Sequence, residues 1–281
     1  MPVTISTFYK FVAIDDPEGL KAELAALGCG HGIKGTILLA HEGVNATVSG
    51  TGDAVAIVLA VLRADSRFSD LVSKESYAAA HPFRRFKVKV KPEIVSFGHP
   101  EVNPAKGAGT YVPPQQWNAL IQQPDVVVVD TRNAYEYDIG TFRGARDPKT
   151  RSFREFAQFV EANLDPARDR RVAMFCTGGI RCEKSTAYLR SKGFEDVYHL
   201  EGGILKYLEV VPPSESLWQG ECYIFDDRVA LEHGVTPGHY QHCTRCGFPV
   251  QVTAGVTGSE AGAGTGTASA CPNCAGHGVK I

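Results

Sequence analysis

The sequence predicts two α/β domains followed by a small cysteine-rich region. Three observations support this: a strand–helix–strand–strand–helix–strand order in the first third, four consecutive valines among alternating strands and helices in the middle, and two Cys-x-x-Cys pairs near the end. The 281 residues leave room for two domains, or for three if one is small. We expect domains at residues 1–95, 110–212 and 213–281, with a linker at 96–109.

Composition excludes several classes of protein. With 43% hydrophobic and 21% charged residues, the chain is neither disordered nor collagen-like nor a coiled coil. The longest apolar run, Ala54 to Leu62, has nine residues, whereas a membrane-spanning helix needs roughly 18. The first residues lack a basic stretch followed by an apolar one, so we expect no signal peptide and a cytoplasmic protein. Because the net charge is only -2, any nucleic-acid site must be a local patch.

The first domain is expected to be a ferredoxin-like βαββαβ sandwich. A strand rich in Val, Ile, Phe and Thr comes first, and Asp16-Pro17-Glu18 then opens a helix with leucines at helical spacing that closes at Gly28. Glu42-Gly43 joins two short strands as a hairpin. The expected elements are strands at 3–12, 36–40, 44–48 and 86–90 and helices at 17–28 and 53–64.

The middle domain shows a different pattern. The valines at 126–129 form the continuous apolar run that is typical of a parallel strand covered on both faces. A helix with a phenylalanine stripe at 152–164, a strand at 171–175 and a helix at 183–192 follow. Because strands and helices alternate, this is an α/β domain with a parallel sheet.

Cys176 is the candidate reactive residue. It follows the strand 171–175 and precedes Thr177, Gly178, Gly179, Ile180 and Arg181, after which a helix begins. The unpaired N–H groups of such a turn point at the sulfur, and Arg181 adds a fixed positive charge, so the thiolate is favoured. The alternative is a buried structural thiol. Cys182 could resolve an oxidised Cys176, although we favour a plain helix-face residue because adjacent helical residues point about 100° apart.

These residues carry a family resemblance. The loop, together with Asp130-Thr131-Arg132, Glu136, Gly140, Gly144-Ala145 and Gly202-Gly203-Ile204, resembles a rhodanese domain over residues 110–212. A six-residue loop such as Cys176 to Arg181 suits a sulfur-bearing nucleophile in that family, whereas the related phosphatases use a loop one residue longer. The resemblance implies that Asp130 and Arg132 brace the loop. The alternative for this pair is a helix cap and a surface charge.

Segments before and after the rhodanese-like region indicate a more specific family. The string from Phe175 to Ser185, preceded by Lys34 to Asn45 and followed by Phe225-Asp226-Asp227-Arg228-Val229, resembles the oxygen-dependent tRNA uridine hydroxylase family over nearly the whole chain. The resemblance implies an oxidoreductase that makes 5-hydroxyuridine at the tRNA wobble position, using molecular oxygen and a loop cysteine that matches Cys176. It implies tRNA, through the anticodon stem-loop, as the partner. No flavin, haem, iron or nicotinamide motif is visible, and we predict neither membrane nor protein partners.

A basic strand indicates RNA binding independently of the family resemblance. On a strand, alternate residues share a face, so apolar residues can pack on the domain while cations face outward. An equally weighted alternative is a solvated outer strand protected by lysine. The candidate RNA-binding residues are Arg84, Arg85, Lys87, Lys89 and Lys91.

Two cysteine pairs predict a metal site. Twenty-four residues separate them, and most of these form a Gly, Ala, Ser and Thr tract at 253–270 that we expect to be a mobile loop. Four thiolates suit structural Zn²⁺, with unliganded cysteines or an iron–sulfur cluster as alternatives. We expect His242 to be a bystander, and Cys29 and Cys222 to be structural. The candidate ligands are Cys243, Cys246, Cys271 and Cys274.

The residues together favour a cytoplasmic tRNA-modifying oxidoreductase. A thiosulfate or persulfide sulfurtransferase is the enzyme alternative, because the Cys176 loop alone supports it equally well. A zinc-ribbon RNA-binding protein with a rhodanese scaffold is the non-catalytic alternative, and the presence of both Cys176 and Arg181 counts against it.

Overall fold

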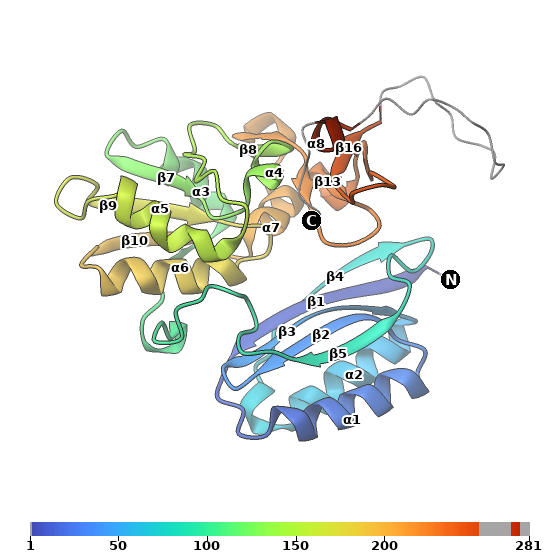
Figure 1. Cartoon of the computed structure of the whole chain (residues 1–281). Coiled ribbons are helices and arrows are strands. Elements are labelled where there is room, and N and C mark those ends of the chain that lie inside the picture. Colours follow the sequence, from blue (N-terminus) through green and yellow to red (C-terminus); the bar gives the residue numbers. More distant parts are fainter. Residues whose placement is uncertain (1, 253–270, 276–281) are drawn as a thin grey trace.

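The computed structural model describes residues 2–252 and 271–275. The expected loop at 253–270 therefore lies outside the described residues. Figure 1 shows the N-terminal sheet with its helices on one side, the middle α/β domain opposite its other face, and the cysteine-rich region beside the middle domain. The fold class expected from the sequence is confirmed.

The N-terminal domain is a five-stranded sheet in the order β4-β1-β3-β2-β5, with two helices covering one face. The expected strand order omits β4, which pairs antiparallel with β1. The strand expected to close the motif is instead a fifth strand, β5, and pairs parallel with β2. The elements are β1 (Val3–Phe11), α1 (Pro17–Gly30), β2 (Lys34–Ala40), β3 (Gly43–Gly50), α2 (Gly52–Ala64), β4 (Ser73–Ala78) and β5 (Phe86–Val90).

Local sequence explains these elements. The Asp16 carboxylate accepts a hydrogen bond from the Gly19 N–H at 2.8 Å, and Pro17 occupies the first turn, so α1 begins there. Thr51 caps α2 in the same way through the Ala54 N–H. On β5, alternate residues, beginning with Phe86, pack into the core between sheet and helices. The lysines between them face the opposite side of the sheet.

The middle domain has a parallel sheet in the order β6-β10-β9-β7. On β7, Val128 and Val129 belong to two different core clusters, so the sheet is covered on both faces, as the valine run predicts. The elements are β6 (Thr110–Val112), α3 (Pro114–Ile121), β7 (Val126–Asp130), α4 (Ala134–Tyr137), β8 (Gly140–Phe142), α5 (Phe156–Asn163), β9 (Arg171–Phe175), α6 (Ile180–Ser191), β10 (Asp196–Leu200) and α7 (Gly203–Val210).

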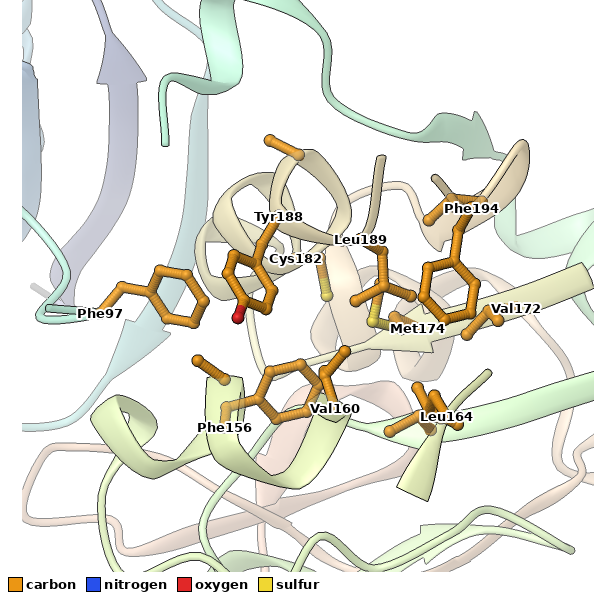
Figure 2. Packing of buried hydrophobic residues seen from close by; sticks show 14 of the residues in the cluster. Phe97, Phe156, Val160, Leu164, Val172, Met174, Cys182, Tyr188, Leu189 and Phe194 are labelled. Carbon is orange, nitrogen blue, oxygen red and sulfur yellow. The ribbon is translucent and has the colours of Figure 1, made fainter. Parts of the chain in front are cut away.

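The segment between the two domains is packed. Phe97 is fully buried and lies edge-on to Tyr188 of α6, with 5.4 Å between ring centroids; Figure 2 shows its ring beside that of Tyr188. Buried Lys184 of α6 forms ion pairs with Glu42 at 2.9 Å and Glu93 at 2.6 Å. The N-terminal domain is therefore fixed against the helix that follows Cys176.

The C-terminal region continues from the middle domain, because β11 pairs with β8. None of the helices that the structure describes is long and apolar enough to cross a membrane. The strands and helix of this region are β11 (Trp218–Gly220), β12 (Cys222–Tyr223), β13 (Ala230–Glu232), β14 (Thr236–Pro237), β15 (Tyr240–His242), β16 (Pro249–Gln251) and α8 (Pro272–Ala275). Short 3-10 helices in the chain occupy Ser66–Phe68, Pro104–Lys106, Phe153–Glu155, Pro213–Glu215 and His233–Val235.

Candidate active site

Cys176 lies directly after β9, at the start of the turn that leads into α6. The Gly179 N–H donates a hydrogen bond to its Sγ at 3.1 Å. Gly179 has a φ of +106°, and a Cβ there would lie 2.8 Å from the Tyr9 hydroxyl, so this position requires glycine. The Cys176 side chain is almost entirely buried, yet it lines the large cavity between the domains.

The surroundings of Cys176 favour its thiolate. Burial raises the pKa of this thiol, but the Cys182 thiol, the Arg181 guanidinium and the N–H groups of Cys182 and Gly179 outweigh burial and lower it below its ordinary value. The pKa of Cys182 is raised, by burial and by Cys176. Cys182 is buried rather than on an outer helix face, and its Sγ lies 3.7 Å from Thr131 Oγ1. A negative charge is therefore held on Cys176 and not on its neighbour.

Arg181 is fixed by a partner that the residues alone did not identify. Its two terminal nitrogens donate to the two Glu136 carboxylate oxygens at 2.7 and 2.8 Å, and both side chains are buried. Arg181 also donates to Thr177 Oγ1 at 3.2 Å. Glu136 stands three residues after Asn133 and completes a capping box, which is the one sequence signal for its orientation.

Asp130 and Arg132 form a fully buried ion pair at the end of β7. Arg132 donates to Asp130 at 2.6 Å and to the Gly140 carbonyl at 2.5 Å, so this pair holds the segment after β7. Thr131, between them, contacts the reactive loop more directly. Its N–H and its hydroxyl both donate to the Phe175 carbonyl at 3.0 Å, immediately before Cys176.

The N-terminal domain contributes two residues that sequence reasoning missed. Lys74 of β4 donates to the Gly178 carbonyl at 2.9 Å and to the Gly202 carbonyl at 2.5 Å. Burial lowers the pKa of Lys74 to about 8, although the charge of Cys176 opposes this. The Tyr9 hydroxyl donates to Glu183 of α6 at 3.2 Å. These contacts join residues more than 100 positions apart, so no local motif predicts them.

A cavity of about 1880 Å³ separates the reactive loop from the open face of the N-terminal sheet. Its walls include Cys176, the sheet residues Thr36 and Asn45, and the exposed ring of Phe225. Seven carboxylates line it as well as eight cations, which come from all three parts of the chain. The cations are Lys10, Lys74, Lys91, Arg151, Arg154, Arg181, Lys206 and Arg228.

The predicted basic strand lies on the same sheet face as this cavity. Lys87 and Lys89 are exposed, and they pair in register with Thr36 and Leu38 of β2, which line the cavity. Residues paired in register project from the same face of a sheet. Lys91 lines the cavity itself. Arg84 and Arg85, just before β5, are exposed as well.

The four candidate metal ligands converge. The Sγ atoms of Cys243, Cys246, Cys271 and Cys274 lie within 4.8 Å of one another. Cys243 and Cys274 are 3.9 Å apart, and Cys246 and Cys271 are 3.4 Å apart. Tetrahedral Zn²⁺ with bonds of about 2.3 Å requires sulfurs about 3.8 Å apart, so the set fits zinc.

His242, Cys222 and Cys29 are not among the four converging cysteines. His242 Nδ1 lies 3.0 Å from the Gly247 carbonyl. Cys222 is buried, and burial raises the pKa of its thiol to about 12, whereas Cys29 is exposed on α1.

In the motif from Lys34 to Asn45, the Asn45 side chain donates to the Ile94 carbonyl at 3.0 Å and Glu42 pairs with Lys184. That motif therefore joins the two domains.

Two parts of the chain match known protein families. Residues 3–94 match the UPF0176 acylphosphatase like domain, and residues 113–209 match the rhodanese-like domain. A tRNA uridine(34) hydroxylase of Mesorhizobium japonicum is 52% identical over 273 residues, covering 97% of this chain and 87% of the relative. Enzymes of the same name from Synechocystis (52%; 90% of this chain, 91% of the relative) and Picosynechococcus (54%; 88% and 83%) are similar over most of their length. The resemblance drawn from the sequence is confirmed: the chain belongs to the tRNA uridine(34) hydroxylase family.

Proposed function

We propose that this protein hydroxylates uridine 34 of tRNA, with Cys176 as the reactive thiolate. The observation that carries the proposal is the position of this thiol. It is held by the Gly179 N–H, its pKa is lowered, and it borders the large cavity between the domains. Relatives of that name at 52 to 54% identity support the same activity.

The residues around Cys176 take distinct roles in this proposal. The backbone of Thr177 to Arg181 and the Arg181 guanidinium hold negative charge at the sulfur, and Glu136 keeps Arg181 in position. Asp130 and Arg132 hold the neighbouring segment, and Thr131 links that segment to Cys176.

The RNA partner is the anticodon stem-loop, bound across the cavity. A polyanion needs cations, and both the cavity walls, where carboxylates also lie, and the exposed lysines of β5 carry them. Arg84, Arg85, Lys87, Lys89 and Lys91 contact phosphates, which position the RNA without reading its sequence. An anticodon loop already presents splayed bases, so bringing uridine 34 to Cys176 requires little unstacking.

Molecular oxygen is the proposed co-substrate. Hydroxylation replaces the C5–H of uracil with C5–OH, so one oxygen atom enters the base. The family resemblance assigns that atom to molecular oxygen, and the second oxygen atom leaves as water after it takes two protons and two electrons from an external reductant. Because tRNA is the substrate, we place this activity in the cytoplasm.

The C-terminal cysteines are proposed to hold one structural Zn²⁺. Their mutual spacing suits a tetrahedral ion that has no open coordination position. When bound, zinc would contribute folding free energy to a region built of strands only two or three residues long. We further propose units at 1–95, 110–212 and 213–281, with 96–109 as a packed connection.

Sulfur transfer is the second candidate, because a six-residue loop with an N–H aimed at Sγ would also hold a persulfide anion. One comparison separates the two activities. Nucleosides of tRNA are analysed by mass spectrometry from cells with and without this protein, grown with and without air. Hydroxylation predicts 5-hydroxyuridine only with both the protein and air present. Rapid thiocyanate formation from thiosulfate and cyanide, with no change in tRNA, would favour the sulfurtransferase.

A further inference from the structure

One aromatic side chain on the cavity wall is exposed without serving the fold. The Phe225 ring is 63% exposed, and it lines the same cavity as Cys176. An apolar ring left in water loses the stabilisation that burial would give it. Tyr111, another exposed aromatic residue on the cavity wall, already donates its hydroxyl to Glu183 at 2.7 Å. Phe225 has no polar group, so a ligand can contact its exposed ring only by packing against the ring's face or edge.

The exposure of Phe225 is built into a rigid loop. The Asp226 carboxylate accepts hydrogen bonds from the Arg228 N–H at 3.0 Å and from the Arg228 guanidinium at 2.6 Å. The next residue, Val229, has a φ of +64°, which a β-branched residue adopts only under constraint. The loop therefore holds a strained backbone while it presents Phe225 to the cavity.

The same loop is anchored to the N-terminal domain. The Asp227 N–H donates to the Pro82 carbonyl at 3.1 Å, and Arg228 donates to the Ser76 hydroxyl of β4 at 3.2 Å. These bonds hold the position of Phe225 relative to the sheet that carries the basic strand. The loop that carries the ring is thus bonded to the N-terminal domain, and the ring lines the same cavity as Cys176.

The immediate neighbours of Phe225 suit a nucleobase. The Arg181 guanidinium carbon lies 5.9 Å from the ring centroid, and Arg181 closes the loop that begins at Cys176. The Tyr223 ring supports Phe225 edge-on, with centroids 5.1 Å apart and planes at 88°. Arg181 lies over the ring and is paired with Glu136, so a base would stack on the part of the ring that Arg181 and Tyr223 leave exposed.

We propose that Phe225 is the stacking platform for the target uracil, and that it holds the unstacked base in the cavity beside the Cys176 loop. The inference rests on the proposed function and adds the surface that receives the base. It also gives the Phe225–Val229 motif a role: Asp226, Arg228 and Val229 fix the ring, and Phe225 contacts the substrate.

The test compares two transcripts of one tRNA, which carry either uridine or an abasic nucleotide at position 34. Affinity is measured by fluorescence anisotropy for the wild type and for Phe225→Ala, Phe225→Trp and Tyr77→Ala. Tyr77 is a matched control, because it is 64% exposed on β4 and does not line the cavity. Base stacking on an aromatic ring contributes roughly 1–3 kcal/mol, so Phe225→Ala should weaken binding of the uridine transcript about 5- to 150-fold.

The abasic transcript should bind Phe225→Ala and the wild type equally, because it has no base to stack. Phe225→Trp should keep near wild-type affinity, and Tyr77→Ala should behave as wild type with both transcripts. Equal binding of the uridine transcript by the wild type and Phe225→Ala, with hydroxylation unimpaired, would overturn the platform and leave the proposed function standing. A wild-type protein that neither binds nor hydroxylates the uridine transcript would overturn both.

Discussion

Two groups of cysteines in this molecule differ in what surrounds them. Around Cys176, one thiol faces a peptide N–H and a guanidinium, and the neighbouring Cys182 thiol keeps its proton. In the C-terminal region, four thiols face one another within 4.8 Å. A single thiolate beside positive charge is suited to react, whereas four sulfurs at tetrahedral spacing are suited to bind a metal. The neighbours of a cysteine, more than its burial, determine which of these roles it can take.

The largest expected effect is on activity, and it distinguishes Cys176 from the four C-terminal cysteines. Cys176→Ser should reduce 5-hydroxyuridine formation to background, because a serine hydroxyl stays protonated where the thiol ionises. Affinity for tRNA and zinc content should remain near wild type. Nucleoside mass spectrometry, anisotropy and metal analysis measure the three quantities, and a serine variant that still hydroxylates would contradict the assignment of Cys176.

Replacing one of the proposed zinc ligands should change the zinc content of the protein. The purified protein should contain about one zinc per chain, and Cys243→Ala should lose it and loosen the C-terminal region. Metal analysis and limited proteolysis report these changes. Cys29→Ala, at an exposed cysteine on α1, is the matched control and should keep the metal. Visible absorption from a bound cluster, or wild-type protein without metal, would refute the zinc assignment.

Lys74→Met should destabilise the thiolate form of Cys176, with a smaller effect than those of the two cysteine substitutions. Removing a positive charge near Cys176 raises the thiol pKa, so the thiolate fraction should fall at a higher pH than in the wild type. The difference should be measurable near pH 5, where the pKa of Cys176 lies, and should vanish at higher pH, where the thiol is ionised in both proteins. The pH dependence of Cys176 alkylation by iodoacetamide, followed by peptide mass spectrometry, measures this shift.

Lys91→Met provides the control for that experiment, since Lys91 lines the cavity from the same domain but is exposed. It should leave the alkylation profile unchanged. Superimposable profiles for Lys74→Met and the wild type would show that Lys74 does not influence the thiol.

The smallest expected effect concerns the basic strand. If Lys87 and Lys89 each neutralise one phosphate, replacing both with alanine should flatten the slope of log affinity against log salt by about 1.4 to 1.8. Binding should weaken for all tRNAs alike. Lys21→Ala, on α1, should not change the slope. An unchanged slope in a correctly folded double variant would place the RNA elsewhere.

Local patterns predicted much of this molecule, whereas contacts between domains could not be predicted. The turn after Cys176 and the two cysteine pairs are short motifs with local geometry. Strand β4 was missed because it lies at a sheet edge and its sequence, SKESYA, has little of the apolar alternation that marks a strand. Phe97 lies in the expected linker yet is buried in the middle domain, because its partner Tyr188 is distant in sequence.

The candidate site shows the same limit. The pattern around Arg181 predicted a charge near the thiol but not Glu136 as its partner, since the two residues meet only when α4 and α6 pack. Lys74 reaches the loop from another domain. Sequence reasoning proposes Cys176 as the reactive residue, and the structure shows which residues contact its loop.

The most direct test of this account uses the isotopic origin of the new hydroxyl group. Cells lacking their own hydroxylase would express this chain or Cys176→Ser and grow under ¹⁸O₂, and nucleosides from position 34 of their tRNA would be weighed by mass spectrometry. The account predicts 5-hydroxyuridine that carries one ¹⁸O atom with the wild type, and no 5-hydroxyuridine with the serine variant. A hydroxyl group that carries only oxygen from water, or labelled product with Cys176→Ser, would contradict it.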